Sequence, residues 1–169
     1  MEYSKCSTVT VGRKNLLDKI LFKIAENEDE LKEYFHLRHE VFVKEQQVFS
    51  ETDIDEYDTN PVHEALHLIA VKESDEKMVG GVRCYKKEGN TWFGGRLSAA
   101  RGYRNGRVGA GLVKFAVETI KSTDCQTFLA YVQPQNVRFF IRLGWSPVGE
   151  LETYQGSPHQ LMKANLESN

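Results

Sequence analysis

Hydrophobic residues fall into short segments along most of the chain, separated by polar and charged turns. Some segments are short and mostly apolar, which is typical of β-strands. Others repeat their apolar residues every three or four positions, which is typical of amphipathic helices. The segments that predict strands are 20–25, 66–71, 78–85, 92–99, 128–132, 148–154 and 160–166. The segments that predict helices begin near residues 27, 108 and 134.

Local signals mark where these helices begin and end. Asn27 is placed to cap the first helix, with Glu30 three residues on to complete a capping box. Pro134 suits the first turn of the third helix, and Gly144 suits the left-handed position that ends it. In chain order, a meander of strands precedes two strand–helix units and a closing pair of strands. This order predicts an α/β protein with a mixed, mostly antiparallel sheet.

The composition is that of one ordinary globular domain. Of 169 residues, 40% are hydrophobic and 27% are charged, which is enough chain to bury a proper core. Residues 1–14 are polar and without pattern, so we expect a loose N-terminal tail before a single domain over 15–169. A net charge of −2 gives no reason to expect nucleic acid or membrane as a partner, and no segment approaches the length of a membrane span.

The cysteines and histidines give no metal or disulfide pattern. Cys6, Cys84 and Cys125 are odd in number and far apart, which fits a reducing cytoplasm. His63 and His67 are four residues apart, but they span a predicted loop-to-strand junction and have no obvious third ligand. The acidic segment 51–58 lacks the glycine and distal glutamate of an EF-hand. We therefore expect a cytoplasmic protein without a metal site.

A turn rich in arginine and glycine joins the strand 92–99 to the second helix. Glycine lets the backbone approach a bulky ligand, and the first amides of a helix have no partner within it. Such a turn suits an anion such as a pyrophosphate, and Arg104 and Arg107 add positive charge. The alternative is an ordinary tight turn with solvated arginines.

The two strand–helix units together resemble the GNAT superfamily of N-acetyltransferases. Arg104-x-x-Gly-x-Gly109 is similar to the superfamily turn that holds the pyrophosphate of acetyl-coenzyme A, and Asn136 with Gly144-Trp145 is similar to its second motif. The resemblance covers about two-thirds of the chain and implies a sheet with a splayed strand pair flanked by helices. It assigns to acetyl-CoA the residues Leu97, Ser98, Ala99, Arg104, Asn105, Gly106, Arg107, Val108, Gly109, Ala110, Gly111, Asn136 and Phe140.

The chain departs from the superfamily pattern at two positions. Arg107 stands where a glycine is usual, so the phosphate turn is either shifted by a residue or uses the arginine side chain. Phe140 stands where many relatives carry the tyrosine that protonates the departing thiolate, and a phenyl ring has no proton to donate. Tyr131, at the end of the preceding strand, is a candidate replacement; its alternative role is that of a core tyrosine.

The first helix carries charge on its apolar face. Counting from Leu31, the helical period places Arg38 and Glu45 on the inward stripe, where a charge needs a partner. The acidic segment that follows supplies carboxylates. An ion pair that pins this segment to the helix is one interpretation, and a polar wall of the acceptor pocket is the other.

The front half of the chain has a narrower resemblance. Arg38-His-Glu-Val-Phe42, Asp53-Ile-Asp-Glu-Tyr-Asp58 and Gly80-Gly-Val-Arg83 are similar to elements of the acyl-homoserine-lactone synthases and of a set of bacterial acetyltransferases. The whole chain is most similar to a bacterial and cyanobacterial GNAT subgroup associated with nitrogen starvation. The resemblance implies that the acceptor pocket is bounded by Arg38, Asp53, Arg83 and Arg96.

Several residues are candidates for proton transfer. Asp55 and Asp58 are our first choices as the group that takes the proton of a cationic amine, ahead of Glu45. His159, near the turn of the closing strands, is a further candidate base; its alternative is a turn histidine bonded to backbone. For the acidic segment, the alternative is a solvated surface loop.

These observations predict an acetyl-CoA-dependent N-acetyltransferase that acts on a small-molecule amine by direct attack in a ternary complex. An acyltransferase that uses longer acyl donors is the enzymatic alternative. A non-catalytic acyl-CoA-binding module is the alternative from another class, because the usual acid is missing. Dimers are common in GNAT relatives, so a homodimer is compatible with the resemblance.

Overall fold

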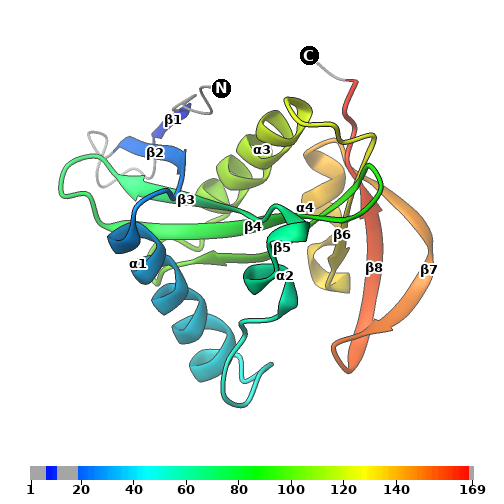
Figure 1. Cartoon of the computed structure of the whole chain (residues 1–169), viewed down its shortest axis with the longest axis horizontal. Helices are drawn as coiled ribbons and strands as arrows, with labels where there is room; N and C mark the ends of the chain where they lie inside the picture. The colour runs from blue at the N-terminus through cyan, green and yellow to red at the C-terminus, as the bar shows by residue number, and fades with distance from the viewer. Residues whose placement is uncertain (1–6, 11–18, 168–169) are drawn as a thin grey trace.

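The computed structural model describes residues 7–10 and 19–167, and over these residues a single sheet organises the chain (Figure 1). The strands are β1 Ser7–Thr10, β2 Lys19–Ile24, β3 Leu66–Lys72, β4 Met78–Glu88, β5 Thr91–Ala99, β6 Thr127–Val132, β7 Ser146–Tyr154 and β8 Ser157–Lys163. They lie in the order β1-β2-β3-β4-β5-β6-β8-β7. The predicted α/β class with a mixed, mostly antiparallel sheet is confirmed.

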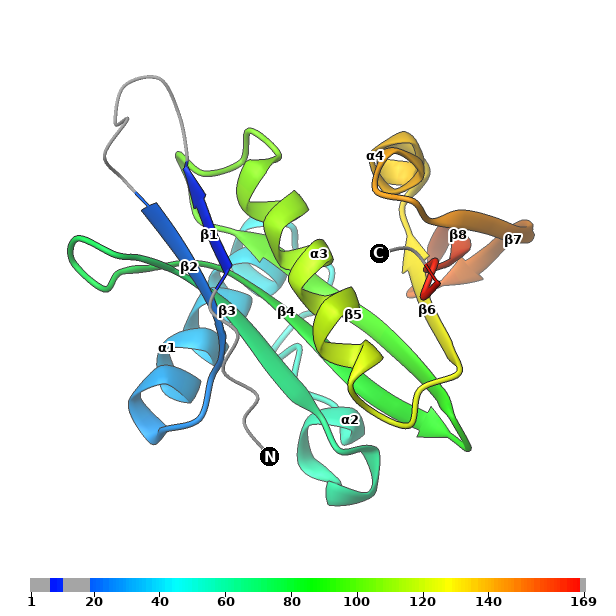
Figure 2. The ribbon, with the colours of Figure 1, turned by 90° about the horizontal axis from the view of Figure 1, so that it is seen from above.

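One strand pair in this sheet is parallel, and it separates along its length. β5 pairs with β6 only from Thr91 opposite Thr127 to Gly94 opposite Ala130. Beyond that point β5 continues to Ala99 beside β4, whereas β6 pairs with β8 on its other side. Figure 2 shows β6, β7, β8 and α4 turned away from the rest of the sheet. The described strands thus contain the splayed pair that the resemblance implied.

Helices cover both faces of the sheet. They are α1 Glu28–Arg38, which continues into the π-helical turn η1 His39–Glu45, α2 Glu56–Thr59, α3 Arg107–Lys121 and α4 Val137–Arg142, with 3-10 turns η2 Pro61–His63 and η3 Pro134–Asn136. Helix α3 lies on one face, and α1 and α2 lie on the other (Figures 1 and 2). The larger hydrophobic core lies beneath α3, and a smaller core lies beneath α1.

Glycines in β4 allow helices to approach the sheet closely from both sides. A Cβ on Gly80 would lie 2.8 Å from Val108 Cγ1 of α3. A Cβ on Gly81 would lie 2.8 Å from the ring of Tyr34 in α1. Because neighbouring residues of a strand face opposite sides of the sheet, this glycine pair makes room for α3 and α1 at the same level.

The predicted signals at helix ends are confirmed. The Asn27 side chain accepts a hydrogen bond from the Glu30 amide, at 2.8 Å, and the Glu30 carboxylate accepts from the Asn27 amide in return. Gly144, which directly follows Leu143 at the end of α4, has φ +92°. The predicted third helix forms in two parts, because the segment from Pro134 begins as a 3-10 turn before α4.

Two predicted boundaries need correction. Residues 7–10, predicted to belong to a loose tail, form β1 and pair with β2, since their backbone adds a strand to the sheet edge; the other residues of 1–14 lie outside the described part. The closing strand ends at Lys163 instead of Leu166. Its hairpin turn uses Gln155 and Gly156, both with positive φ, so that the strand begins at Ser157.

Candidate functional site

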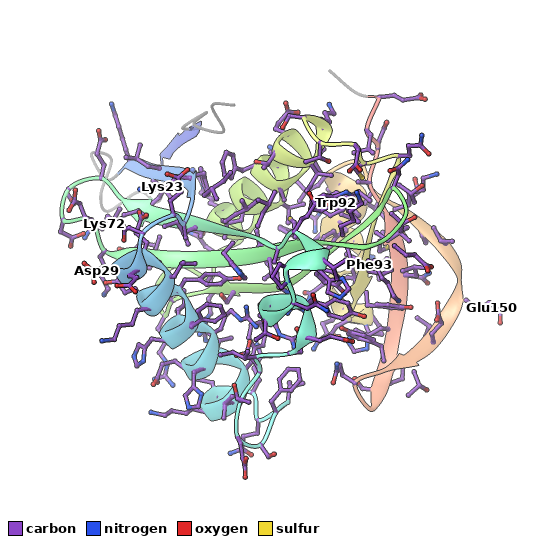
Figure 3. The ribbon with its side chains drawn as sticks, in the orientation of Figure 1. Lys23, Asp29, Lys72, Trp92, Phe93 and Glu150 are labelled. Atoms are coloured by element: carbon purple, nitrogen blue, oxygen red, sulfur yellow. The ribbon has the colours of Figure 1, made fainter. Side chains whose placement is uncertain are left out.

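A cavity of about 480 Å³ opens where β5 and β6 separate. Its wall includes Phe128 and Ala130, which belong to the core beneath α3, and also Phe93 and Tyr131, which stack on the opposite face. Figure 3 shows the same alternation in β5, where Trp92 and Phe93 extend to opposite sides of the strand. Because residues from both faces line one cavity, the opening passes between the two strands and connects the two sides of the sheet.

A bulge in β5 shapes this opening. Between the pairs Gly81–Ser98 and Arg83–Gly95, β5 carries one more residue than β4, and Arg96 there has φ +54°. A left-handed residue with a side chain costs about 1–3 kcal/mol, and bulges of this kind re-aim side chains next to functional sites. An ideal Cβ on Gly95 meets no atom within 4 Å, so this part of the wall is open.

The same strand offers a backbone donor to the opening. The Ala100 amide donates to the Val79 carbonyl of β4, at 2.8 Å. Consecutive amides of a regular strand point to opposite sides, so that of Ala99 points away from β4, toward the edge that β6 has left. Leu97 lines the cavity, as predicted. By the same alternation the Ser98 amide points toward β4, and its buried hydroxyl also donates to the Gly81 carbonyl of β4, at 3.5 Å.

The start of α3 has the geometry of an anion site. Gly106 precedes the helix with φ +91° and provides no side-chain cap, while the Asn105 side chain accepts from the Arg107 amide, at 3.1 Å. The first bond within the helix runs from the Ala110 amide to the Gly106 carbonyl, so Val108 and Gly109 contribute the intervening amides. The described geometry therefore fits a diphosphate at this helix start.

Residue Gly111 serves packing instead of cofactor contact. An ideal Cβ there would lie 2.2 Å from Phe22 Cζ, so only a glycine lets α3 rest on β2 at this level. The Val108 side chain is likewise fully buried in the core, which leaves its backbone as the group available to a ligand. By contrast, a Cβ on Gly109 would come no closer than 3.7 Å to the Phe139 ring of α4.

Arg104 and Glu45 bind each other in this structure. Their side chains form an ion pair of 2.8 Å, and Arg104 Nε also donates to the Ala99 carbonyl, at 2.9 Å. Glu45 lies 3.6 Å from Arg101 as well, and it does not line the cavity. In this structure the Glu45 carboxylate holds η1 to the loop before α3, and its predicted role as proton acceptor stays a prediction without support from the lining of the cavity.

The residues predicted to bound the acceptor pocket meet in a buried cluster of arginines and aspartates. Arg38 is fully buried and binds Asp53 at 2.6 Å and Asp58 at 2.8 Å. Arg83 binds Asp55 at 2.6 Å and Asp58 at 3.0 Å. Arg96 binds Asp53 at 3.2 Å and Asp55 at 3.3 Å. We call these six residues the Arg–Asp cluster, and it joins α1 and the acidic segment to β4 and β5.

This cluster bears on the predicted role of the aspartates. Burial alone would raise the pKa of Asp58, but the hydrogen bond from Arg38 and the charges of Arg38 and Arg83 hold this pKa well below its ordinary value. Asp55 accepts from Arg83 and Arg96 and caps α2 through the Tyr57 amide. Neither aspartate lines the cavity, whereas Arg83 and Arg96 do. The three aspartates of the acidic segment thus form a charge-neutralised clamp with the arginines, which gives no support to a proton-accepting role for Asp55 or Asp58.

On the face away from α3, a row of aromatic rings crosses the sheet. Tyr85 stacks on Phe93 at 6.0 Å, Phe93 on Tyr131 at 5.7 Å, and Tyr131 on Tyr154 at 4.3 Å. These four residues, here called the aromatic row, all line the cavity. Of these four residues, only Tyr131 was a candidate from the sequence, because the row depends on the order of the strands in space.

His159 closes the row. Its ring meets the Tyr154 ring edge to face at 5.2 Å, and its Nδ1 lies 3.0 Å from the Ser157 carbonyl. Since a carbonyl only accepts, Nδ1 carries the proton and Nε2 keeps the lone pair in the neutral ring. His159 lines the cavity, and so do the predicted Asn136 and Phe140. Among the described residues that line it, none is an aspartate or a glutamate.

Burial raises the pKa of Tyr131, with smaller contributions from the charge of Glu152 and from Tyr154. The phenol therefore keeps its proton over the neutral range.

Within the described ranges, no helix is long and apolar enough to cross a membrane, and no group of three His, Cys, Asp or Glu side chains is placed to hold a metal ion.

The chain is similar to known acetyltransferases in sequence and in structure. Residues 25–145 match the family model described as acetyltransferase (GNAT) family. The uncharacterized N-acetyltransferase YjcF of Bacillus subtilis (strain 168) is 34% identical over 142 residues, which cover 83% of this chain and 96% of YjcF.

Three solved structures have the same fold at low sequence identity. Escherichia coli ElaA has a TM-score of 0.74 at 23% identity, covering 86% of this chain and 99% of ElaA. The CoA-dependent acyl-homoserine lactone synthase BjaI, solved with SAM and isopentyl-CoA, has a TM-score of 0.67 at 18% identity, covering 83% of this chain and 77% of BjaI. An aminoglycoside 6'-N-acetyltransferase complexed with coenzyme A has a TM-score of 0.69 at 16% identity, covering 88% of this chain and 98% of that one.

The similarity to BjaI agrees with the predicted likeness to lactone synthases, at the level of the fold. The descriptions of these relatives do not refer to nitrogen starvation, so that association stays a prediction. With the family model covering residues 25–145 and a relative at 34% identity, the chain belongs to the GNAT acetyltransferase family, whose members use acyl-CoA.

Proposed function

We propose that the protein transfers an acetyl group from acetyl-CoA to the amine of a small molecule, by direct attack in a ternary complex. The observation that carries this proposal is the cavity that passes between β5 and β6 and is lined from both faces of the sheet. Two substrates entering from opposite faces meet there without a covalent enzyme intermediate, and positioning of this kind contributes up to about 7–11 kcal/mol to lowering a barrier.

On the side of α3, the chain has groups that suit acetyl-CoA. The amides of Val108 and Gly109 and the dipole of a 15-residue helix suit its diphosphate. Arg104 is 44% exposed at this turn, and it can exchange Glu45 for a phosphate without leaving a buried charge. Asn136 and Phe140 line the path from this helix into the cavity, where the pantetheine arm would lie.

A thioester supplies a carbonyl carbon that an amine attacks, with a C–N bond forming, the C–S bond breaking and a thiolate leaving. The outward-pointing amide of Ala99 is suited to hold the carbonyl oxygen, because a fixed backbone donor stabilises developing negative charge there. No side chain of the described Arg–Asp cluster is needed as a base, since its carboxylates are already bound by guanidinium groups.

His159 is the group that we assign to the amine proton. It is the one imidazole among the described residues that line the cavity, and the Ser157 carbonyl fixes its tautomer with Nε2 as the acceptor. Tyr131 is assigned to the departing thiolate in place of Phe140, because its phenol lies in the same cavity and keeps its proton. These two assignments place base and acid on adjacent strands, β8 and β6.

A variant of His159 tests the assignment of the base. His159→Asn keeps a short side chain that can donate to the Ser157 carbonyl but removes the lone pair at Nε2. Thiol release from acetyl-CoA with a panel of small amines should fall by about 10²–10⁴-fold at neutral pH, a typical contribution of general base catalysis. Calorimetric affinity for CoA should not change, and the rate should recover at high pH, where the free amine is already neutral.

His36→Asn, at an exposed position of α1, is the matched control and should leave the rate unchanged. A His159→Asn rate with the pH profile of the wild type would exclude His159 as the base. If the wild type binds CoA but turns over no amine, the catalytic proposal fails, and the result favours the alternative of a non-catalytic acyl-CoA-binding module.

An acyltransferase with longer donors is the second candidate, and the fold shared with the lactone synthase BjaI favours it. The donor series acetyl-, butyryl- and isopentyl-CoA separates the two candidates with one amine held constant. A higher kcat/KM for acetyl-CoA supports the first proposal, and a maximum at a branched or longer chain supports the second.

A further inference from the structure

The charges around the cavity are arranged in two layers. Arg83 and Arg96 line the cavity, and the three aspartates that neutralise them do not. Each aspartate binds its arginines from behind: Asp53 and Asp55 hold Arg96, and Asp55 and Asp58 hold Arg83. With no carboxylate among the described lining residues, the positive ends of these ion pairs face the space in which an acceptor would lie.

One guanidinium nitrogen of Arg96, Nη1, remains available as a hydrogen-bond donor. Its Nε and Nη2 donate to Asp53 and Asp55, and its Cζ lies 4.4 Å above the ring of Phe49. Its Nη1 has no partner among the described residues. Because the other two nitrogens and the ring fix the plane of the group, Nη1 is held as a rigid donor in the wall of the cavity.

Arg83 also retains donor capacity. It is 1% exposed, and its Nε has no hydrogen-bond partner in the described structure, although its other nitrogens bind Asp55 and Asp58. Its guanidinium lies 4.9 Å over the Tyr85 ring, at one end of the aromatic row. Arg83 Nε is itself enclosed, so Arg96 Nη1 is the guanidinium donor left for a ligand, and both arginines line the same cavity as the aromatic row.

The rings of the aromatic row stack on one another, so their faces are largely occupied by neighbours. Their edges and phenolic hydroxyls are left to meet a ligand. Ring edges carry positive potential, which suits the face of a flat, electron-rich body in an edge-to-face contact. Phe49, whose ring lies beneath the Arg96 guanidinium, adds an apolar surface to the lining of the cavity.

We propose that the acceptor is an amine that also bears a carboxylate, of the aromatic amino acid class, with the carboxylate bound by Arg96 and the ring placed against the aromatic row. This inference rests on the proposed function, since it names the acceptor of the same site. It also reverses the expectation from the sequence alone, in which an acidic segment attracts a cationic amine. A polyamine would place its additional positive charges close to Arg83 and Arg96, which line the cavity.

Matched pairs of amines test this proposal on the wild-type protein. Tyrosine and tyramine, and likewise tryptophan and tryptamine, differ only in the carboxylate, and spermidine serves as the cationic comparison. With acetyl-CoA at saturation, kcat/KM should be about ten-fold or more higher for the carboxylated member of each pair, since a charged hydrogen bond is at stake. Higher kcat/KM for tyramine or spermidine would overturn the proposal.

Variants identify the residue responsible. Arg96→Gln should remove the preference for the carboxylate, and Arg96→Lys should retain part of it, because the charge remains but the planar fork is lost. Lys87→Gln is the matched control: it removes one positive charge near Phe93 from a side chain that does not line the cavity. It should leave the preference intact. If Arg96→Gln changes the affinity for acetyl-CoA and not the choice between amines, Arg96 serves the donor and the proposal fails.

Product binding separates failure of this inference from failure of the proposed function. The affinities of N-acetyltyrosine and N-acetyltyramine, measured by calorimetry in the presence of CoA, need no turnover. Tighter binding of N-acetyltyrosine that depends on Arg96, without turnover of any amine, would support the inferred ligand class while the catalytic proposal falls. Equal binding of the two products would overturn the inference whether or not the protein is an enzyme. A thermal melt of each Arg96 variant establishes that it is folded.

Discussion

The two sides of the cavity are built in different ways. The donor side comes mainly from one continuous stretch, in which the end of β5, the turn at Arg104–Gly106 and the start of α3 follow one another directly. The acceptor side draws on α1, the acidic segment, β4, β5, β6 and the β7–β8 hairpin. In the proposed function, backbone amides bind the ligand on the first side, whereas side-chain charges and rings bind it on the second. The first is therefore robust to most side-chain changes, and the second depends on the whole fold being in place.

The strongest test of this contrast is removal of Arg38. Arg38→Ala leaves Asp53 and Asp58 buried with fewer cations, and loss of one partner from a buried ion pair costs about 3–5 kcal/mol. The free energy of unfolding from urea titration should fall by that amount. Lys44→Ala, which breaks an exposed pair with Glu40 in the neighbouring turn, should leave it nearly unchanged. Equal stability of the two variants would mean that the Arg–Asp cluster does not hold the acceptor side together.

The pH dependence of stability gives a second, smaller effect on the same side. The pKa of His67 is lowered from 6.5 to about 4, mainly by burial; the charge of Asp58 opposes this shift, and the charges of Arg38 and Arg83 add to it. The unfolded chain then binds more protons than the native state between pH 6.5 and 4. The contribution of His67 to the free energy of unfolding is therefore fully present above pH 6.5. The free energy of unfolding should decline by up to about 3 kcal/mol as the pH falls to 4.

The control for this decline is a variant without the imidazole. His67→Phe keeps a ring beside Tyr34 and Phe35, which lie 4.8 and 5.2 Å away, and should flatten the profile between pH 6.5 and 4. His36→Asn, exposed on α1, should retain the wild-type slope. Identical slopes for His67→Phe and the wild type would show that other groups cause the acid sensitivity.

Two glycines of α3 sharpen the comparison from the donor side. Gly111→Ala forces a methyl group against Phe22 and should destabilise the fold by about 1–3 kcal/mol. Gly109→Ala meets only ordinary contact with Phe139, so stability should stay level or rise by about 0.5–1 kcal/mol, because alanine favours a helix over glycine. Thermal unfolding measures both effects.

The same pair separates packing from ligand contact. Gly109→Ala should weaken CoA binding by about ten-fold, comparable to the loss of one charge-assisted hydrogen bond, since its methyl group lies at the diphosphate turn. Calorimetry with CoA measures this loss. Unchanged affinity in Gly109→Ala would place the diphosphate away from the start of α3 and would remove the donor side from the proposal.

Much of the fold could be predicted because its signals are local. The alternation of apolar residues in the strands, the Asn27 cap and Gly144 each act within a few residues, and each is found where expected. Of the residues predicted for the donor side, Leu97, Asn136 and Phe140 line the cavity, whereas Gly111 packs against Phe22; contact with acetyl-CoA stays a prediction. A sequence motif does not distinguish a glycine that meets a ligand from one that meets a neighbouring strand.

The acceptor side was predicted only in part. The inward position of Arg38 and its need for a carboxylate followed from helical periodicity, and the ion pairs are present. The sequence did not show which carboxylates remain unbound, because Asp55 and Asp58 are bound by arginines from β4 and β5 that lie 25–41 residues away along the chain. Glu45 was likewise bound by Arg104, far from it in sequence.

The sequence by itself determined the strands and helices, the glycine turn at the start of α3 and the absence of a phenol at position 140, because each depends on residues a few positions apart. Only the tertiary structure decided which charges are neutralised, which arginine nitrogens remain unbound, and that four rings from β4, β5, β6 and β7 form one row. The physical reason is that a charge or a ring acts over a few ångströms in space, and the order of the strands sets which side chains come within that distance.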